Sequence, residues 1–588
     1  MAETSSPHSD NIPQEAVSGS MRCRAIVGAG LLSVILLLLG ARLAHIQIQQ
    51  SDRFRKLAQQ QNFANRTLSA RRGNIYDQAG RTLATSVPRW SVFADPAMID
   101  DPTLTANLLS KTLDLSPAGI RESLQSERRF LWIRRQVPHH QVNMLRRHDL
   151  DGIHFRKEYH RQHPPTRLFG HVVGFTDIDG RGISGAELQF DGLLRSTPGE
   201  QKILRDALGR TILRPHNPTV IRPENGYDIQ LTVDAYVQHV AREALNRQVK
   251  KHQPDSAWAV VMDVQTGAVL AMVNHPEFNP NSPTDTPPDN HRNRITADSY
   301  EFGSVMKPIT VAAALEEKLV NPETIIPCHN GAWRIGRRLL RDVHGYDELS
   351  VSDVITYSSN IGAAHIGLRL GPHRFYTALT RFGFGQPAEI NLPGVRSGIL
   401  RSPERWNKHS NISISFGQEI SSSPLAVANA FAALANGGLL MRPHVLDNVR
   451  DQETGKIVWK SKKQPVVRRV ISKRTSVQVM RMLRKVVTDG TGERVQLKEF
   501  PVAGKTGTAS LPRSDGRGYS NRYLGSFVGI APSDNPRIVA LVSLKNPTQN
   551  GYYGGLVAGP ACRKILLKTL RYLNVPERVE NPEIAEVP

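Results

Sequence analysis

The chain has 588 residues, which is too long for one hydrophobic core, so several domains are expected. Hydrophobic residues make up 39% and charged residues 22%, and these values exclude a mainly disordered chain. The net charge of +22 indicates a solvated basic surface, or attraction to anionic lipid or to a phosphate-bearing lipid substrate. Because there is no zinc-finger spacing and no basic region leading into heptads, a nucleic-acid-binding domain is not supported.

An apolar run near the N-terminus predicts a membrane anchor. Residues Ala25 to Ala41 read AIVGAGLLSVILLLLGA without a charge, which is at the short end of a spanning helix. The residues that follow Leu39 contain no small-x-small cleavage site, so an uncleaved anchor is favoured over a signal peptide. Arginines flank both ends of the run, and the positive-inside rule therefore does not set its orientation.

The segment after the anchor reads as a strand-rich domain. Arg72 to Asp77, followed by Ala79-Gly80-Arg81, predicts a strand, a tight turn and a second strand. Residues 212–226 hold three prolines together with turn signals at asparagine and glycine. We therefore predict a domain boundary near residue 225.

A second body begins near Tyr227 and predicts a mixed α/β layer fold. Two apolar runs, 259–264 and 268–273, flank Gln265-Thr266-Gly267 and predict a β-hairpin. Strands at both ends of this body with helices between them favour sheet and helix layers. Further patterns predict helices at about 305–319, 351–369 and 424–436, a strand at 538–542, and a loose acidic tail at 576–588.

Ser304 and Lys307 form the first candidate for chemistry. They lie in Gly303-Ser304-Val305-Met306-Lys307-Pro308, directly before a helical pattern, where a serine can cap the helix. Residues three apart share a helix face, so the two side chains are expected to be neighbours. A serine hydroxyl needs an adjacent base, and lysine can act as one only when it is neutral. Taken alone, the pattern fits a capping serine and a surface lysine better than a catalytic pair.

Two further motifs strengthen the case for catalysis. Ser358-Ser359-Asn360 lies in the second helical pattern and offers a hydroxyl and an amide, although Ser533-Asp534-Asn535 is a rival with the same spacing. The stretch Lys505-Thr506-Gly507-Thr508 holds the one Lys-Thr-Gly of the sequence. It supplies a cation and two hydroxyls for a carboxylate, and its glycine permits close backbone approach.

Other chemistries are not supported. Gly504-Lys505-Thr506 resembles half of a phosphate-binding loop, but the glycine that this motif requires five residues earlier is Glu499. Ser304 is not in a Gly-x-Ser-x-Gly elbow. Cys23, Cys328 and Cys562 form no Cys-x-x-Cys pair, so we expect free thiols unless the fold brings the last two together.

Ser-x-x-Lys, Ser-x-Asn and Lys-Thr-Gly in this order resemble the penicillin-recognising serine transpeptidases and β-lactamases. The likeness covers roughly residues 25–570 and is greatest to class B penicillin-binding proteins, in their septal, division-type branch similar to penicillin-binding protein 3. It also rests on Arg72-Gly73 with Asp77, His171 to Phe175 with Glu187, the hairpin at 257–273, Arg292-Asn293-Arg294 and Tyr552-Tyr553-Gly554-Gly555.

The resemblance implies a role for each matching residue. Ser304 would be the acylated nucleophile and Lys307 its base, while Ser358 and Asn360 would handle the proton path and the substrate amide. Lys505, Thr506 and Thr508 would bind the terminal carboxylate beside Gly507. The backbone N–H groups of Ser304 and Thr508 would form the oxyanion hole. The implied reaction releases D-Ala from a stem peptide and crosslinks the acyl group to an amine on a neighbouring stem, with no metal and no other cofactor.

The same resemblance implies a domain plan. It comprises a cytoplasmic tail at 1–24, a transmembrane anchor at 25–45, a mostly-β non-catalytic pedestal or dimerisation domain at 46–225, a β-lactamase-like transpeptidase domain at 226–575 with a helix-flanked antiparallel sheet, and the tail at 576–588. The catalytic domain would face the periplasm of a bacterial inner membrane. Expected partners are peptidoglycan stem peptides, β-lactam antibiotics, the membrane, a polytopic glycosyltransferase and other division proteins, and no nucleic acid is expected.

Alternative functions remain open on the sequence. These are an elongation-type transpeptidase, a β-lactam sensor or scaffold, a carboxypeptidase or β-lactamase, and a basic polyanion-binding membrane protein. The chain also departs from the family pattern: Phe302 stands where proline is usual, Glu419 where glycine is common, and Ser423 where threonine is usual before proline. These departures suggest a divergent paralogue with altered β-lactam affinity or a conditional role.

Overall fold

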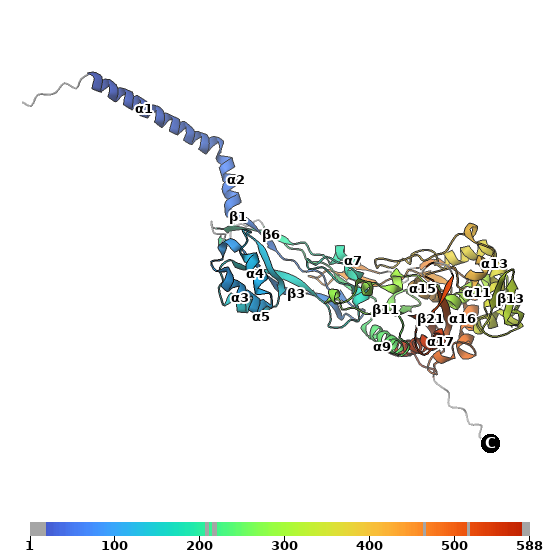
Figure 1. The fold of residues 1–588 in the computed structure, drawn as a ribbon. Coiled ribbons are helices and arrows are strands. Elements are labelled where there is room, and N and C mark those ends of the chain that lie inside the picture. The colour runs from blue at the N-terminus through green and yellow to red at the C-terminus, as the bar shows by residue number, and fades with distance from the viewer. Residues whose placement is uncertain are drawn as a thin grey trace, which may run out of the picture. The chain divides into compact units, whose positions relative to one another are not determined.

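The computed structural model describes residues 19–205, 211–213, 220–461, 466–513, 515 and 518–578. The predicted cytoplasmic tail up to residue 18 and the predicted C-terminal tail from residue 579 lie outside the described residues. The chain forms two compact units: residues 1–68 with 198–223, and residues 69–197 with 224–588. Figure 1 shows the order of their elements along the chain.

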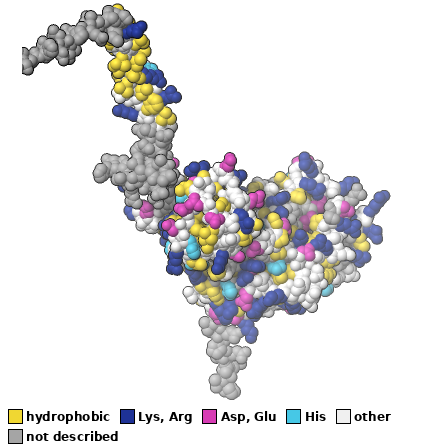
Figure 2. All heavy atoms as spheres, turned by 60° about the vertical axis from the view of Figure 1, so that its left-hand side comes forward, with side chains coloured by type: hydrophobic (Ala, Val, Ile, Leu, Met, Phe, Trp, Pro, Cys, Tyr) yellow, Lys and Arg dark blue, Asp and Glu magenta, His cyan; other side chains and the backbone are white. Residues whose placement is uncertain are grey.

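The first unit carries the apolar helix that the sequence predicts. A 27-residue stretch, Cys23–Gln49, is long and apolar enough to cross a membrane, and none of it is buried against other parts of the chain. Figure 2 shows hydrophobic side chains around this helix. The unit also contains an antiparallel sheet in which β6 pairs with β1, β7 and β8. Its elements are α1 (Gly19–Ala44), η1 (His45–Gln49), α2 (Ser51–Asn62), β1 (Phe63–Leu68), β6 (Gly199–Arg205), β7 (Thr211–Leu213) and β8 (Val220–Ile221).

In the second unit, one seven-stranded sheet joins segments that are far apart in the sequence. Its order is β18-β17-β9-β2-β3-β4, and β5 pairs with the long strand β3. The expected strand, turn and strand near Tyr76 are present as β2 and β3. The strands are β2 (Ile75–Tyr76), β3 (Thr82–Ala94), β4 (Leu131–Val137), β5 (Ile153–Gln162), β9 (Asp228–Leu231), β17 (Leu446–Arg450) and β18 (Ile457–Lys460).

Short helices accompany the N-terminal strands of this sheet. An apolar cluster packs Val92 and Ala94 of β3 against Leu109 of α3 and Val142 of α5. The helices of this region are η2 (Pro96–Met98), α3 (Pro102–Leu113), α4 (Pro117–Leu124), α5 (His139–Arg146), α6 (Gly170–Val173), α7 (Gly185–Gln189) and α8 (Asp191–Leu194).

A buried ion cluster links the start of β2 to α7. Glu187 is fully buried and its two carboxylate oxygens pair with Arg72 at 2.7 Å and with Arg161 at 2.6 Å. Arg72 also pairs with Asp191 at 2.6 Å. A buried carboxylate is stable as an anion only when it is paired in this way. The two guanidinium groups therefore hold the pKa of Glu187 below its usual range, although burial acts in the opposite direction.

The site is built around a second, five-stranded antiparallel sheet with the order β11-β10-β22-β21-β20. Alternate residues of β10 face opposite sides: Trp258 and Val260 join one apolar cluster, and Ala259 and Val261 join another. Both faces are covered by helices, with α9 and α18 on the face of Ala259. The strands are β10 (Ser256–Asp263), β11 (Val269–His275), β20 (Ala503–Pro512), β21 (Tyr519–Ala531) and β22 (Ile538–Lys545).

Helices and small hairpins complete the region between β11 and β20. Small sheets are formed by β12 with β15, β13 with β14, and β16 with β19. The helices are α9 (Ala235–His252), η3 (Pro283–Asp285), η4 (Pro288–His291), α10 (Arg294–Ala297), η5 (Gly303–Met306), α11 (Lys307–Glu316), η6 (His329–Gly331), α12 (Val351–Thr356), α13 (Asn360–Arg381), η7 (Pro403–Arg405), α14 (Ser410–Ser415), α15 (Pro424–Ala435), α16 (Lys473–Thr488), η8 (Glu493–Val495), α17 (Gly554–Val557) and α18 (Gly559–Tyr572); the strands are β12 (Ile325–Pro327), β13 (Ala332–Ile335), β14 (Arg338–Arg341), β15 (Glu348–Ser350), β16 (Leu439–Met441) and β19 (Val466–Arg469).

Two expectations about this region need correction. The pattern at 351–369 is not one helix, because α12 ends at Thr356 and α13 begins at Asn360 after a residue with left-handed backbone, Ser358 (φ 64°). Ser304 does not cap a helix: it lies within the 3-10 turn η5, and α11 begins at Lys307 without a side-chain cap. The predicted hairpin is confirmed, since β10 and β11 pair antiparallel on either side of Gly267 (φ 75°).

Candidate active site

Ser304 lies on a half-buried turn, and Lys307 is fully buried one helical turn further on. The Lys307 Nζ donates hydrogen bonds to Asn360 Oδ1 at 2.8 Å and to Ser358 Oγ at 3.2 Å, and it also contacts the Ser358 carbonyl oxygen. A protonated lysine has three N–H donors, and these three acceptors use all of them. Among the described residues, none donates to or accepts from the Ser304 hydroxyl, which remains available to a substrate.

The turn Ser358–Asn360 brings the second motif to Lys307. Ser358 takes a left-handed conformation between α12 and α13, and the hydroxyl of Ser358 and the amide of Asn360 both reach the lysine. Such conformations cost free energy for a non-glycine residue and occur often at functional sites. Ser359 faces the other way and caps α13, accepting the Gly362 N–H at 2.8 Å.

Asp342 holds this turn in place, although the sequence gives no sign of its role. One carboxylate oxygen accepts the N–H of Asn360 at 2.5 Å and that of Ile361 at 3.1 Å. The other oxygen accepts the Ser359 hydroxyl at 2.5 Å. An anion at the N-terminus of a helix is stabilised by the free N–H groups there. Asp342 follows directly after β14. Its contacts join two separate segments of the chain, and no motif with a fixed spacing in the sequence identifies such a residue.

The third motif lies on β20, the edge strand of the five-stranded sheet. Lys505 is fully buried, and its Nζ donates to Ser358 Oγ at 2.9 Å. The Ser358 hydroxyl oxygen therefore lies between Lys505 and Lys307. The Thr506 hydroxyl contacts that of Thr491 at 2.8 Å, and Thr508 Oγ1 accepts the Gly554 N–H at 3.0 Å.

Gly507 allows η5 to lie directly against β20. A Cβ on this glycine would come within 2.7 Å of the Phe302 carbonyl oxygen and 2.5 Å of a Val305 methyl group. No larger residue fits without moving the turn that carries Ser304. The first and third motifs, which begin 201 residues apart in the sequence (505 − 304), thus meet because of one close backbone approach.

The electrostatics of the site favour neutral lysine. Burial lowers the pKa of Lys307 to about 7, and the nearby carboxylate of Asp342 opposes this shift. Burial and the neighbouring Lys307 charge both hold the pKa of Lys505 well below its usual range. When Lys307 loses a proton it gains a lone pair, and it can then accept a proton from a hydroxyl. The arrangement can therefore activate a serine nucleophile at neutral pH.

The residues that depart from the family pattern lie beside η5. Phe302 is almost fully buried, and Ser423 caps α15 by accepting the Ala426 N–H at 3.2 Å, as a threonine would. Glu419 takes a left-handed conformation (φ 60°), donates its N–H to Glu301 Oε1 at 3.1 Å, and pairs with Arg401. Burial raises the pKa of Glu301. The departures therefore leave the hydrogen bonds of Lys307 and Lys505 intact.

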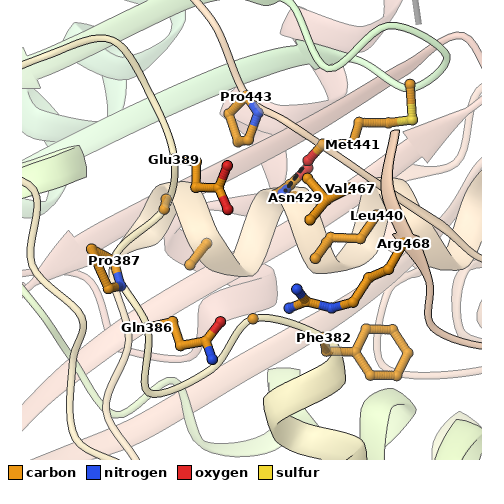
Figure 3. A pocket seen from close by; sticks show the side chains of 13 residues that line it. Phe382, Gln386, Pro387, Glu389, Asn429, Leu440, Met441, Pro443, Val467 and Arg468 are labelled. Carbon is orange, nitrogen blue, oxygen red and sulfur yellow. Dashed lines mark hydrogen bonds between the residues drawn. The ribbon is translucent and has the colours of Figure 1, made fainter. Parts of the chain in front are cut away.

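Other features are separate from this site. The rival motif at 533–535 lies between β21 and β22, and among the described residues it has no hydrogen bond to either lysine. A cavity of about 40 Å³ is lined by Asn429, Met441 and Arg468, and Asn429 donates to the Met441 carbonyl at 3.0 Å (Figure 3). None of the predicted site residues lines it. All three cysteines are free thiols, as expected.

Comparison with known proteins identifies the family to which the chain belongs. Residues 257–567 match the penicillin-binding protein transpeptidase domain, and residues 67–231 match the penicillin-binding protein dimerisation domain. The chain is 32% identical to the probable peptidoglycan D,D-transpeptidase PenA of Neisseria meningitidis, over 96% of this chain and 95% of PenA. It is also 32% identical to the peptidoglycan D,D-transpeptidase FtsI of Escherichia coli, over 95% of this chain and 92% of FtsI.

A solved structure shares the fold. The peptidoglycan synthetase of Bifidobacterium adolescentis superposes with a TM-score of 0.70 and 24% identity, covering 89% of this chain and 98% of that one. Both domain matches, near-complete coverage of the relatives and the mixed α/β fold agree with one another. The chain therefore belongs to the class B penicillin-binding proteins, which combine a dimerisation domain with a transpeptidase domain.

Proposed function

We propose that this chain is a peptidoglycan D,D-transpeptidase of the septal type, with Ser304 as its nucleophile. The observation that carries the proposal is the position of the Ser358 hydroxyl, which two buried lysines contact at 3.2 and 2.9 Å. The family membership and the 32% identity to transpeptidases over nearly the whole chain support the same reaction.

In the first half-reaction, neutral Lys307 accepts the Ser304 proton while Ser304 Oγ attacks the carbonyl carbon of the penultimate D-Ala. The peptide C–N bond breaks, an ester forms on Ser304, and the terminal D-Ala leaves as an amine that has gained a proton. Lys505 donates to the Ser358 hydroxyl oxygen, and this leaves the Ser358 hydrogen free to be donated to the leaving amine. We assign Ser358 to this proton transfer.

In the second half-reaction, an amine on a neighbouring stem peptide attacks the ester carbonyl. The amine loses a proton, the new peptide bond forms the crosslink, and Ser304 regains its proton. The backbone N–H groups of Ser304 and Thr508 are assigned to the oxyanion, and donors of this kind are often worth about 3–4 kcal/mol each.

Substrate binding is assigned to β20. This strand pairs with β21 on one side, and among the described residues no strand pairs with its other edge, to which an extended peptide could add. Lys505, Thr506 and Thr508 are assigned to the terminal carboxylate of the stem peptide, beside Gly507. Asn360, whose amide oxygen already contacts Lys307, is assigned to the substrate amide through its Nδ2 group.

The location follows from the apolar helix and from the relatives. We propose a single-pass inner membrane protein with residues 1–24 in the cytoplasm, the anchor at 25–45 and the catalytic domain in the periplasm. We further propose a pedestal at 46–225 and a transpeptidase domain at 226–575. A polytopic glycosyltransferase and other division proteins remain the proposed partners.

Product analysis distinguishes a transpeptidase from a hydrolase or a sensor. Full-length protein in detergent would be mixed with uncrosslinked glycan strands that carry pentapeptide stems, and the digested products would be separated by mass. We expect crosslinked stem dimers and free D-Ala. Tetrapeptide without dimers would indicate a carboxypeptidase, and no release of D-Ala would indicate a sensor or scaffold.

A further inference from the structure

Two histidines outside the catalytic constellation face each other across a short gap. His329 lies at the start of η6 and His365 lies on α13, and a 3.1 Å hydrogen bond joins their Nε2 atoms. The rings are held by Trp333, whose ring lies 4.1 Å from that of His365 and 5.4 Å from that of His329, both nearly parallel. Neither imidazole can turn away without losing this stacking.

The backbone at His329 is held in an unusual state. His329 (φ 49°) and Asn330 (φ 50°) are consecutive non-glycine residues with left-handed conformation. This conformation costs roughly 1–3 kcal/mol for each such residue and is found most often where function requires it. Here it directs an exposed histidine toward α13.

We propose that His329 and His365 bind one Zn²⁺ ion through their facing Nε2 atoms. With Zn–N bonds of about 2.0–2.1 Å, a 3.1 Å separation gives an N–Zn–N angle of roughly 100°, close to the tetrahedral value. Within the described part of the chain, no cluster of three or more His, Cys, Asp or Glu side chains converges. Water would therefore fill the other positions around the ion.

The neighbouring groups set the strength of binding. Cys328 is adjacent in sequence, but its thiol is buried and contacts the Ile326 carbonyl and Ser359, so it does not complete the site. Arg369, one helical turn beyond His365, places a positive charge near the His365 ring. We therefore expect weaker binding than at a structural zinc site with four protein ligands.

Such an ion would tie the hairpin before Asp342 to α13. The Gly331 carbonyl, two residues from His329, accepts the backbone N–H of Asp342 at 3.0 Å. Asp342 in turn holds the first residues of α13, which also carries His365. The ion would link the segment of His329 to α13, and both already contact Asp342. It would thereby restrict movement of the Ser358–Asn360 turn without contacting the catalytic residues.

Calorimetric titration of full-length protein with ZnCl₂ tests this proposal. The protein must carry no polyhistidine tag, and His329→Ala and His365→Ala are compared with the wild type. His373→Ala is the matched control, because His373 is an exposed histidine in the part of α13 that follows the kink at Gly371. Labelling by a fluorescent penicillin verifies that each variant is folded.

We expect both single variants to lose the same binding event, with zinc affinity reduced roughly tenfold or more, while His373→Ala binds as the wild type does. Mg²⁺ should give no such event, because it prefers oxygen ligands. Identical zinc isotherms for the wild type and His365→Ala would overturn the proposal and would leave the pair as a simple hydrogen bond between two rings.

Discussion

Asp342 and Asn360 are joined by a 2.5 Å hydrogen bond from the Asn360 backbone N–H to the Asp342 carboxylate, and this contact fixes the start of α13. The same carboxylate accepts the Ser359 hydroxyl, so both residues that follow Ser358 depend on it. Asp342, which belongs to none of the three motifs, therefore positions Ser358 and Asn360 so that they contact Lys307.

Asp342→Asn should slow acylation of the protein by β-lactams. The amide retains one acceptor oxygen but loses the charge and the second acceptor, so the turn shifts away from Lys307. A misplacement of about 1 Å can cost on the order of 100-fold in rate. Stopped-flow labelling measures this change. The control is Asp347→Asn, which alters an exposed carboxylate in the same loop; equal rates for the two variants would contradict the positioning role.

The acylation rate should rise with pH through about 7 and then level off. Lys307 acts as a base only when neutral, and burial lowers its pKa to about 7. Below that pH the lysine is protonated and the rate falls. The second-order acylation constant measured between pH 5.5 and 9 tests this. Lys307→Arg should show no such rise, because a guanidinium stays protonated over the whole range. A flat wild-type profile would assign the base to another group.

Gly507→Ala should lower both stability and acylation. The new Cβ would come within 2.7 Å of a backbone carbonyl oxygen of Phe302, which cannot move without displacing η5 and Ser304. Overpacking of this kind costs about 1–3 kcal/mol. Thermal unfolding and penicillin labelling are the measurements. Gly119→Ala serves as the control, since no atom lies within 4 Å of its added Cβ; similar behaviour of both variants would show that the close approach is not required.

Glu187→Gln should destabilise the N-terminal part of the second unit. It leaves Arg72 and Arg161 buried without their shared anion, and breaking a buried pair costs about 3–5 kcal/mol. Because the pKa of Glu187 is lowered in the folded state, its contribution is present near neutral pH and is lost as pH falls through that pKa. Urea unfolding at pH 7 measures the change.

Glu243, an exposed carboxylate that pairs with Arg247 and Lys564, gives the matched control for this variant. Glu243→Gln should change the unfolding midpoint little, since exposed ion pairs contribute about 0–1 kcal/mol. If the unfolding midpoint of Glu187→Gln differed from that of the wild type as little as the midpoint of Glu243→Gln does, the buried cluster would not stabilise the fold.

The parts of the fold that depend on local sequence patterns could be predicted from the sequence. The hairpin at β10 and β11 combines two apolar runs with a glycine turn, and the apolar run after Ala25 predicts a long helix. The order of the three motifs, through the family resemblance, also predicts Ser304, Lys307 and Lys505 as site residues.

The remaining features depend on contacts between distant segments. The break at Ser358 has no glycine or proline to mark it, and the polar run Ser358-Ser359-Asn360 interrupts an otherwise helical pattern only briefly, so one continuous helix is the natural but wrong prediction. The sequence pattern predicts that Ser304 caps a helix, but packing of η5 against Gly507 places it within a 3-10 turn. Asp342 acts across a hairpin whose strands the sequence did not predict.

Covalent labelling tests the central claim most directly. Full-length protein in detergent would be incubated with a fluorescent penicillin, and wild type would be compared with Ser304→Ala on a denaturing gel, with intact mass to count the adducts. We predict one covalent adduct per chain in the wild type and none in Ser304→Ala. A labelled band of equal strength in Ser304→Ala would mean that another residue is the nucleophile, and the absence of any adduct on folded wild-type protein across a panel of β-lactams would contradict the proposed mechanism.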